Sequence, residues 1–132
     1  MIVGNGLIAN SIRTCDREDV ILFASGVSNS VNPSQSDFER EEMMLREHLQ
    51  KDFECLVYFS TVSIEDPSMQ SKAYIQHKKR MEELIKGFGK SYVILRLPNM
   101  LCVNGNPNTL VPYFNKAIKN GDKITILDNA HR

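Results

Sequence analysis

The chain has 132 residues and a mass of 15.0 kDa, which is enough for one compact domain. Its 42% hydrophobic and 24% charged residues are typical of a globular protein and exclude disordered, collagen-like and coiled-coil chains. Sixteen basic residues balance sixteen acidic ones. Because nucleic-acid-binding proteins of this size are usually basic, we expect no nucleic-acid partner.

The sequence shows no sign of a membrane or export signal. No apolar run approaches the roughly 20 residues that span a bilayer. The first residues also lack the basic and apolar regions of a signal peptide. Three widely spaced cysteines, Cys15, Cys55 and Cys102, suit reduced thiols in a packing role. We therefore expect no membrane partner, a cytoplasmic location and, because no His or Cys cluster has zinc-ligand spacing, no metal.

Apolar runs and helical patterns alternate along the whole chain. Runs of four to seven mostly apolar residues are typical of strands buried in a sheet, and Gly, Asn and Pro mark the breaks between elements. The expected elements, in chain order, are a strand at 1–3, a helix at 7–14, a strand at 19–24, a loop at 25–36, a helix at 37–50, a strand at 54–59, a loop at 60–69, a helix at 70–86, a strand at 91–97, a loop at 98–108, a helix at 109–120 and a short strand at 123–127.

The helix expected at residues 37–50 has an apolar side and a charged remainder. Phe38, Leu45 and Leu49 can share one side. We assign Glu41 to the charged remainder, with its acidic and basic neighbours.

This alternation predicts an α/β fold with right-handed crossovers and a mostly parallel sheet. The four main strands should lie side by side in chain order. In such folds ligands bind beyond the carboxyl ends of the strands. The loops that follow the strands are therefore the places where we expect a site.

A glycine-rich turn follows the first strand. Residues 4–9 have the pattern G-x-G-x-x-A, in which Gly4 permits a tight turn and Gly6 lets a pyrophosphate approach the backbone. Ala9 allows the helix to pack closely on the strand. The pattern predicts a dinucleotide-binding loop, with a glycine turn that binds nothing as the alternative.

A tyrosine and a lysine are separated by one turn of the helix at residues 70–86. Tyr74 and Lys78 therefore lie on the same face. An ammonium beside a phenol lowers the pKa of the phenol, so Tyr74 could serve as a general acid or base near neutral pH. The alternative is an exposed face on which Tyr74 is half-buried and Lys78 is solvated.

Polar residues follow two further strands. Thr61 and Ser63 come after the strand at 54–59, and Asn99 comes after the strand at 91–97. A hydroxyl or amide at these points can reach a ligand at the carboxyl edge of the sheet. The alternatives are local hydrogen bonds to the backbone and a turn.

Taken together and in order, these segments resemble the extended short-chain dehydrogenase/reductase family, in its NAD-dependent sugar-nucleotide epimerase and dehydratase branch. The resemblance covers nearly the whole chain. It implies that Tyr74 moves the substrate proton, that Lys78 holds the nicotinamide ribose and that Thr61 binds the reacting oxygen. The cofactor, NAD or NADP, would contact the glycine loop and the strand ends, specifically Gly4, Gly6, Leu7, Ile8, Ala9, Ala24, Ser25, Lys78 and Pro98. The substrate would contact Thr61, Ser63 and Asn99.

The chain departs from the pattern that this family shows. Only a few residues separate the first helix from the strand at 19–24, where a family member has two more strands and two helices. Those strands carry the residue that binds the adenosine ribose. We therefore expect a shortened, Rossmann-like three-layer domain at 1–102 and the start of a substrate-binding region at 103–132.

The resemblance implies hydride transfer between a nicotinamide cofactor and a nucleotide sugar in carbohydrate or surface-polysaccharide biosynthesis. One alternative is a non-catalytic remnant that binds a nucleotide or a partner protein. Another is a fragment without a function of its own, whose uncovered sheet edge pairs with a second copy as a homodimer.

Overall fold

The computed structural model describes residues 1–27, 32–98 and 110–123 of the chain. The chain divides into two compact units, Met1–Pro98 and Asn99–Arg132. The boundary expected between residues 102 and 103 lies outside the described residues and stays a prediction. The expected strand at 123–127 also lies outside them, apart from Lys123.

The first unit contains a four-stranded, entirely parallel sheet. Its strands are β1 (Ile2–Val3), β2 (Val20–Phe23), β3 (Cys55–Thr61) and β4 (Tyr92–Leu97), in the spatial order β1-β2-β3-β4. The α/β class, the parallel sheet and the order of the strands are confirmed. Strand β3 continues two residues further than expected, through Thr61, because Ser60 and Thr61 pair with Arg96 and Leu97.

Three helices belong to this unit, and a fourth belongs to the second. They are α1 (Leu7–Ser11), α2 (Gln35–Leu49), α3 (Ala73–Gly87) and, in the second unit, α4 (Leu110–Asn120). Helix α1 is shorter than expected, because the chain tightens into the 3-10 turn η1 (Arg13–Cys15). The 3-10 turns η2 (Val62–Glu65) and η3 (Pro67–Met69) precede α3, which therefore begins three residues later than expected.

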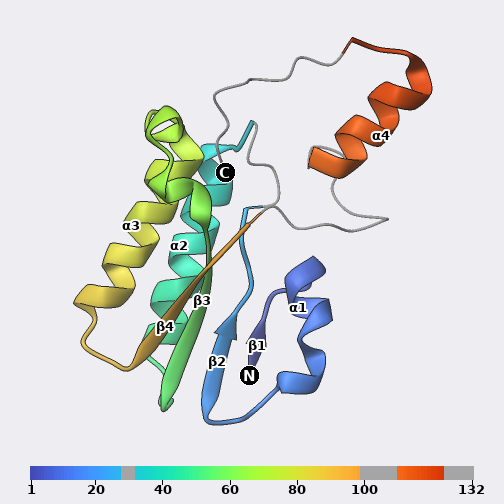
Figure 1. Ribbon diagram of the computed structural model, residues 1–132. Coiled ribbons are helices and arrows are strands. Elements are labelled where there is room, and N and C mark those ends of the chain that lie inside the picture. Colours follow the sequence, from blue (N-terminus) through green and yellow to red (C-terminus); the bar gives the residue numbers. More distant parts are fainter. Residues whose placement is uncertain (28–31, 99–109, 124–132) are drawn as a thin grey trace. The chain divides into compact units, whose positions relative to one another are not determined.

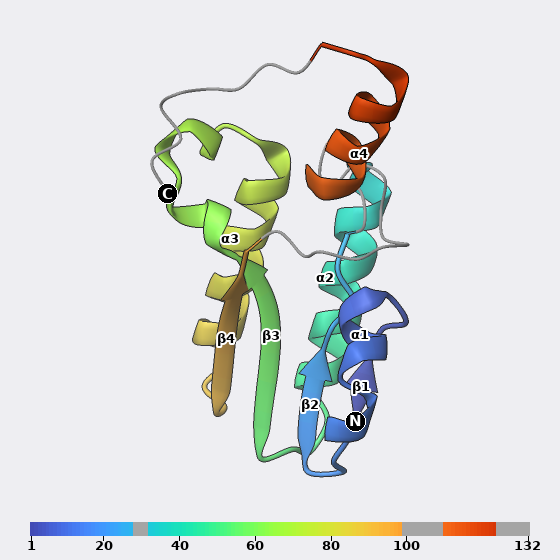
Figure 2. The same ribbon diagram turned by 45° about the vertical axis from the view of Figure 1, so that its right-hand side comes forward.

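The helices lie on both faces of the sheet. Helices α2 and α3 cover one face and α1 lies on the other, as the two views show (Figures 1 and 2). The crossovers from β2 to β3 and from β3 to β4 are right-handed, as expected. The connection from β1 to β2 is left-handed, so the expectation of right-handed crossovers is wrong there. Left-handed crossovers of this kind are rare among known folds.

The core lies between the sheet and helices α2 and α3. Side chains from all three parts are excluded from solvent, and the buried members of the cluster are Val3, Ile21, Phe23, Leu45, Leu49, Leu56, Tyr58, Met81 and Ile85. Alternate residues of each strand point to this face, so Tyr58 of β3 and its register partner Ile94 of β4 both contribute.

The opposite face of β4 is open. Val93 and Leu95 of this strand are 43% and 40% exposed. Strand β4 lies at the edge of the sheet, paired only with β3 among the described residues. Its apolar composition, which is typical of a buried strand, therefore leaves apolar surface uncovered on one face.

Gly4 ends β1 in a conformation that other residues rarely adopt. Its φ is +121°, and a Cβ at this position would lie 2.6 Å from the carbonyl oxygen of Ala24. Both the backbone angle and the close approach to the loop after β2 therefore require glycine.

We predict that Gly4→Ala lowers the free energy of unfolding by about 2–3 kcal/mol, because the variant combines backbone strain with a steric clash. Urea unfolding followed by circular dichroism measures this. Gly87→Ala is the matched control, since Gly87 is helical and has open space around it. It should raise stability by about 0.5–1 kcal/mol. Equal effects of the two variants would contradict the account.

Candidate functional site

The carboxyl ends of the parallel strands meet at one edge of the sheet (Figure 2). The segments that follow β1, β2 and β3 gather there, and Pro98 follows β4 as an exposed residue. These segments hold the residues expected from the sequence to form a site. Asn99 lies outside the described residues, so its expected contact with substrate stays a prediction.

The glycine turn leaves room at the start of α1. Gly6 precedes the helix as its N-cap, with no side-chain cap, and in the part of the chain that the structure describes no atom beyond its neighbours comes within 4 Å of a Cβ built on it. Leu7 is exposed, Ile8 is half-buried and Ala9 is buried at 1% exposure. Ala9 thus takes the close-packing position expected of it. Because α1 has only five residues, its dipole is small. The backbone N–H groups of the turn are therefore the main groups there that could donate hydrogen bonds to a ligand.

The loop after β2 contacts both the glycine turn and α3. The Ala24 N–H donates a hydrogen bond of 2.8 Å to the Val3 carbonyl. The Ser25 hydroxyl is buried and lies 3.7 Å from the sulfur of Met44. Gly26 is exposed, and among the described residues other than its chain neighbours only the Lys78 Nζ comes within 4 Å of a Cβ built on it, at 3.5 Å. Because Gly26 has no side chain, its backbone lies close to this buried nitrogen.

Thr61 is the last residue of β3 and Ser63 follows it, and both are half-buried. The Thr61 Oγ1 accepts a hydrogen bond of 3.2 Å from the Ser63 N–H and so caps the turn η2. This is the local backbone role that the sequence left open. It uses the oxygen of Thr61 as an acceptor and leaves the hydroxyl able to donate.

Tyr74 and Lys78 share one face of α3, as their spacing predicts. The Lys78 Nζ lies 5.8 Å from the centre of the Tyr74 ring. Lys78 is only 3% exposed, so the alternative of a solvated lysine is wrong. The Tyr74 hydroxyl has no hydrogen-bond partner among the described residues. The fold thus brings Tyr74, Lys78 and Gly26 together.

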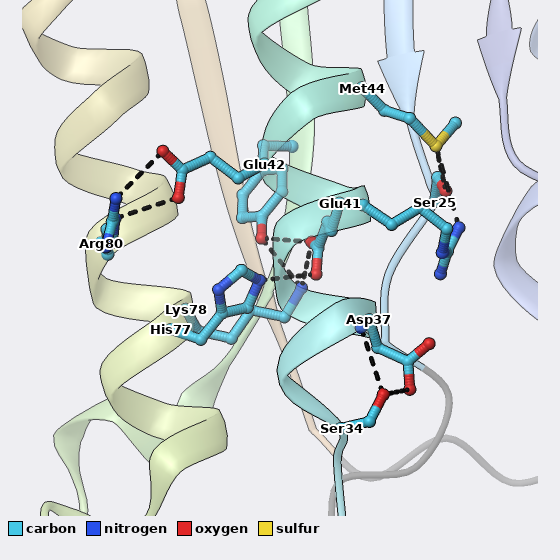
Figure 3. Close-up of polar contacts among 11 residues, drawn as sticks. Ser25, Ser34, Asp37, Glu41, Glu42, Met44, His77, Lys78 and Arg80 are labelled. Carbon is cyan, nitrogen blue, oxygen red and sulfur yellow. Dashed lines mark hydrogen bonds and ion pairs between the residues drawn. The ribbon is translucent and has the colours of Figure 1, made fainter.

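The partner of Lys78 is Glu41 of α2 (Figure 3). The Glu41 Oε1 accepts hydrogen bonds from the Lys78 Nζ at 3.0 Å and from the Tyr58 hydroxyl at 2.8 Å. The Lys78 Nζ also donates to the Tyr58 oxygen at 2.9 Å. The Glu41 Oε2 lies 2.9 Å from the His77 Nε2. The buried cluster of Glu41, Tyr58, His77 and Lys78 therefore joins α2, β3 and α3.

The electrostatics of the buried cluster follow from these contacts. Burial by itself raises the pKa of Glu41, but hydrogen bonds from His77 and Lys78 and the charge of Lys78 outweigh it and lower the pKa to about 2. The carboxylate is therefore ionised at neutral pH, and the His77 Nε2 must carry the proton in their hydrogen bond. Burial and the Glu41 charge raise the pKa of Tyr58 well above its usual value, so Tyr58 remains a donor.

The expected effect of Lys78 on Tyr74 is wrong. Burial, followed by the negative charge of Glu41, raises the pKa of Tyr74 to about 12. The ammonium does not lower it, because the Glu41 carboxylate lies against the same ammonium and offsets its charge. Tyr74 is therefore protonated at neutral pH and can act as a proton donor there.

Sequence reasoning missed Glu41, Tyr58 and His77 as site residues. The assignment of Glu41 to the charged side of its helix is wrong, since its side chain is fully buried. The signal was present in the spacing, because Glu41 lies four residues before Leu45 and three after Phe38, in line with the apolar stripe. Phe38 itself stacks on the His77 ring at 4.4 Å between centroids.

Arg96, near the end of β4, has a structural role. Its guanidinium donates to both carboxylate oxygens of Glu82 in α3, at 3.1 and 2.7 Å, and to Glu65 in η2 at 2.6 Å. Although burial raises the pKa of Glu82, the bonds from Arg96 lower it overall. This ion-pair network ties the edge strand to the helix that carries Tyr74 and Lys78.

Three further expectations concern the cysteines, metal binding and membrane-spanning segments. Cys15 is exposed, so the expected packing role is wrong for it, while Cys55 is half-buried in β3. Among residues 1–27, 32–98 and 110–123, no group of three His, Cys, Asp or Glu side chains is placed to hold a metal ion. In the same residues, no helix has the length and apolar character needed to cross a membrane.

Comparison with known proteins gives no match: no family model, no curated protein and no solved structure matches the chain.

We predict that the buried cluster makes stability depend on pH in the acid range. The pKa of Glu41 is lowered from 4.5 to about 2, so its contribution is present above pH 4.5 and is lost as the pH falls towards 2. The shift corresponds to about 3 kcal/mol in the free energy of unfolding.

Urea unfolding at pH 5 and at pH 2 measures this change. The double variant Glu41→Leu/Lys78→Met replaces the pair by apolar groups and should lose about 3 kcal/mol less over that range than the unmodified protein does. A double variant whose stability falls as steeply as that of the unmodified protein would show that other carboxylates cause the loss.

Proposed function

We propose that the chain is a shortened, Rossmann-like member of the extended short-chain dehydrogenase/reductase family. Its activity would be hydride transfer between NAD or NADP and a nucleotide sugar. One observation carries the proposal: the Lys78 ammonium, the Tyr74 ring and the side-chain-free Gly26 lie together at the carboxyl edge of a parallel sheet. A lysine and a tyrosine placed one helical turn apart at this edge are what such chemistry needs.

The unusual connection between β1 and β2 supports the shortened form. Helix α1 lies on the face opposite α2 and α3, which makes this crossover left-handed (Figures 1 and 2). With its helix on the α1 face, a right-handed crossover from β1 would instead lead to a strand on the side of β1 away from β2. The loss of two strands and two helices from that side would account for the geometry. It would also account for β1 being an edge strand.

The residues present fit one half of a nicotinamide dinucleotide. The open space at Gly6 suits the pyrophosphate, and the Lys78 ammonium beside Gly26 suits the hydroxyls of the nicotinamide ribose. When bound, the cofactor would supply the hydride chemistry. On the adenosine side, Asp16 pairs with the terminal amine at 2.9 Å and Arg17 pairs with Asp19 at 2.6 Å. Because both side chains already have these partners, neither is placed to bind the adenosine ribose, and the choice between NAD and NADP stays open.

The other predicted site residues take roles consistent with this proposal. Tyr74, protonated at neutral pH, would donate a proton to the substrate oxygen, which suits the direction of carbonyl reduction. The Thr61 hydroxyl would donate to the same oxygen, with Ser63 beside it. Ala24, Ser25 and Pro98 would contact the cofactor at the strand ends, and Asn99 would contact the substrate.

A second candidate function is a non-catalytic module that binds a nucleotide or a partner protein. The observation that favours it is the pairing of Lys78, which already donates to Glu41 and to Tyr58. A homodimer belongs to the proposal as well, because a second copy could cover the open face or edge of β4, where Val93 and Leu95 are exposed. The mass of the protein in solution tests that part directly.

We predict saturable binding of NADH or NADPH by isothermal titration calorimetry. Lys78→Met should weaken binding by about 10- to 100-fold, because a hydrogen bond to a charged donor contributes about 1.5–3 kcal/mol. Lys79→Met is the matched control, since Lys79 is the next residue of α3 and is exposed. Tyr74→Phe should keep the cofactor affinity but lose turnover of nucleotide sugars, followed by nicotinamide absorbance.

If neither dinucleotide binds at millimolar concentration, the enzymatic proposal is wrong and the non-catalytic module remains. A Lys78→Met variant that binds as tightly as the Lys79→Met control would remove the role of Lys78. Full turnover by folded Tyr74→Phe would remove the role of Tyr74.

A further inference from the structure

The buried Glu41 carboxylate takes no direct part in the reaction proposed above. We propose that Glu41 is a positioning residue, which holds the Lys78 side chain charged and directed at the Gly26 loop. The inference rests on the proposed function, because that function gives Lys78 its ligand.

The first step of the argument is the geometry of the ammonium. A lysine ammonium has three N–H donors. Among the described residues, two of them are used, one by Glu41 at 3.0 Å and one by Tyr58 at 2.9 Å. The Nζ also lies 3.5 Å from the position of a Cβ on Gly26. The two acceptors therefore fix the nitrogen and leave one donor for a ligand.

The second step is that Glu41 is itself held rigidly. Its side chain is fully buried, and its other oxygen bonds to the His77 Nε2 at 2.9 Å. The His77 ring is in turn stacked on Phe38 of α2. The acceptor that anchors Lys78 is thus fixed from two helices and a strand, as Figure 3 shows for the carboxylate, His77 and Lys78.

The third step concerns charge. Burial favours the neutral form of an amine, and an adjacent carboxylate favours the ammonium. The titratable groups around the Lys78 nitrogen are Glu41 from α2, Tyr58 from β3, and Tyr74 and His77 from its own helix. Among the described residues, only Glu41 is a carboxylate within hydrogen-bond distance of it. Without Glu41, the nitrogen would have no carboxylate within hydrogen-bond distance among the described residues to stabilise the charge that a ribose or phosphate oxygen binds.

The test is the pH profile of NADH and NADPH affinity in Glu41→Gln. In the unmodified protein, affinity should stay constant within about twofold between pH 6 and pH 9. In the variant it should fall by about tenfold or more over that range, since the Lys78 ammonium has lost its carboxylate partner. Glu47→Gln is the matched control, because Glu47 is exposed on the same helix. A merely structural role for Glu41 would lower affinity equally at every pH.

A second readout does not depend on the cofactor. The ammonium resonance of Lys78 in ¹⁵N-resolved NMR should persist across this pH range in the unmodified protein and disappear at the alkaline end in Glu41→Gln. If Glu41→Gln does not fold, Glu41→Asp carries the test, because retracting the carboxylate lengthens the ion pair. It should give the same pH trend with a smaller amplitude.

The outcomes separate the two proposals. If the unmodified protein binds dinucleotide, Lys78→Met weakens binding as predicted and Glu41→Gln follows the unmodified profile at every pH, the positioning role is overturned and the proposed function stands. If the unmodified protein binds neither dinucleotide, the proposed function fails and the positioning role fails with it, even where the NMR resonance changes as expected.

Discussion

A carboxylate that loses all contact with water needs hydrogen bonds and an opposite charge from its neighbours to offset the cost of burial. The buried Glu41 carboxylate therefore constrains the elements of the first unit that pack around it. Its two oxygens accept hydrogen bonds from Lys78, Tyr58 and His77. These partners come from β3 and α3, while Glu41 comes from α2. The three elements cannot shift relative to one another without exposing a charge to the apolar core. The ion pair between Glu41 and Lys78 thus makes the packing specific as well as tight.

The same ion pair links the fold to the candidate site. Lys78 is buried in the core, yet its nitrogen lies against the exposed Gly26 loop, at the edge where the strands end. A flexible lysine on the surface would lose rotamer freedom on binding a ligand. Because the buried cluster has already fixed Lys78, little of that loss remains. Burial raises the pKa of Tyr74, and the negative charge of Glu41 in the same arrangement raises it further.

Much of the fold could be predicted from the sequence, because its signals are local. Continuous apolar runs indicated the strands, and the Gly4 turn, which requires a positive φ, marked the first crossover. The parallel sheet and the order of its strands followed from the alternation of strands and helices. The left-handed connection over α1 could not be predicted, because the alternation of strands and helices does not determine which face of the sheet α1 covers.

The candidate site was predictable only in part. The spacing of Tyr74 and Lys78 placed both on one face of α3, but it did not reveal that Lys78 is buried or what neutralises it. That depends on Glu41, which is 37 positions away in sequence and comes from another helix. A glutamate within an apolar stripe is the one local signal of such a partner. This signal is missed when Glu41 is assigned to the charged side of the helix because of its residue type rather than its position.

The most direct test of the central role of this ion pair is a double-mutant cycle on Glu41 and Lys78, measured as the free energy of unfolding at neutral pH. The variants are Glu41→Gln, Lys78→Met and the two combined. Each single change leaves one buried group without its partner, so we expect a coupling energy of about 2 kcal/mol or more. If the effects of the two substitutions simply add, the two residues do not act as a pair, and the buried ion pair does not organise the fold.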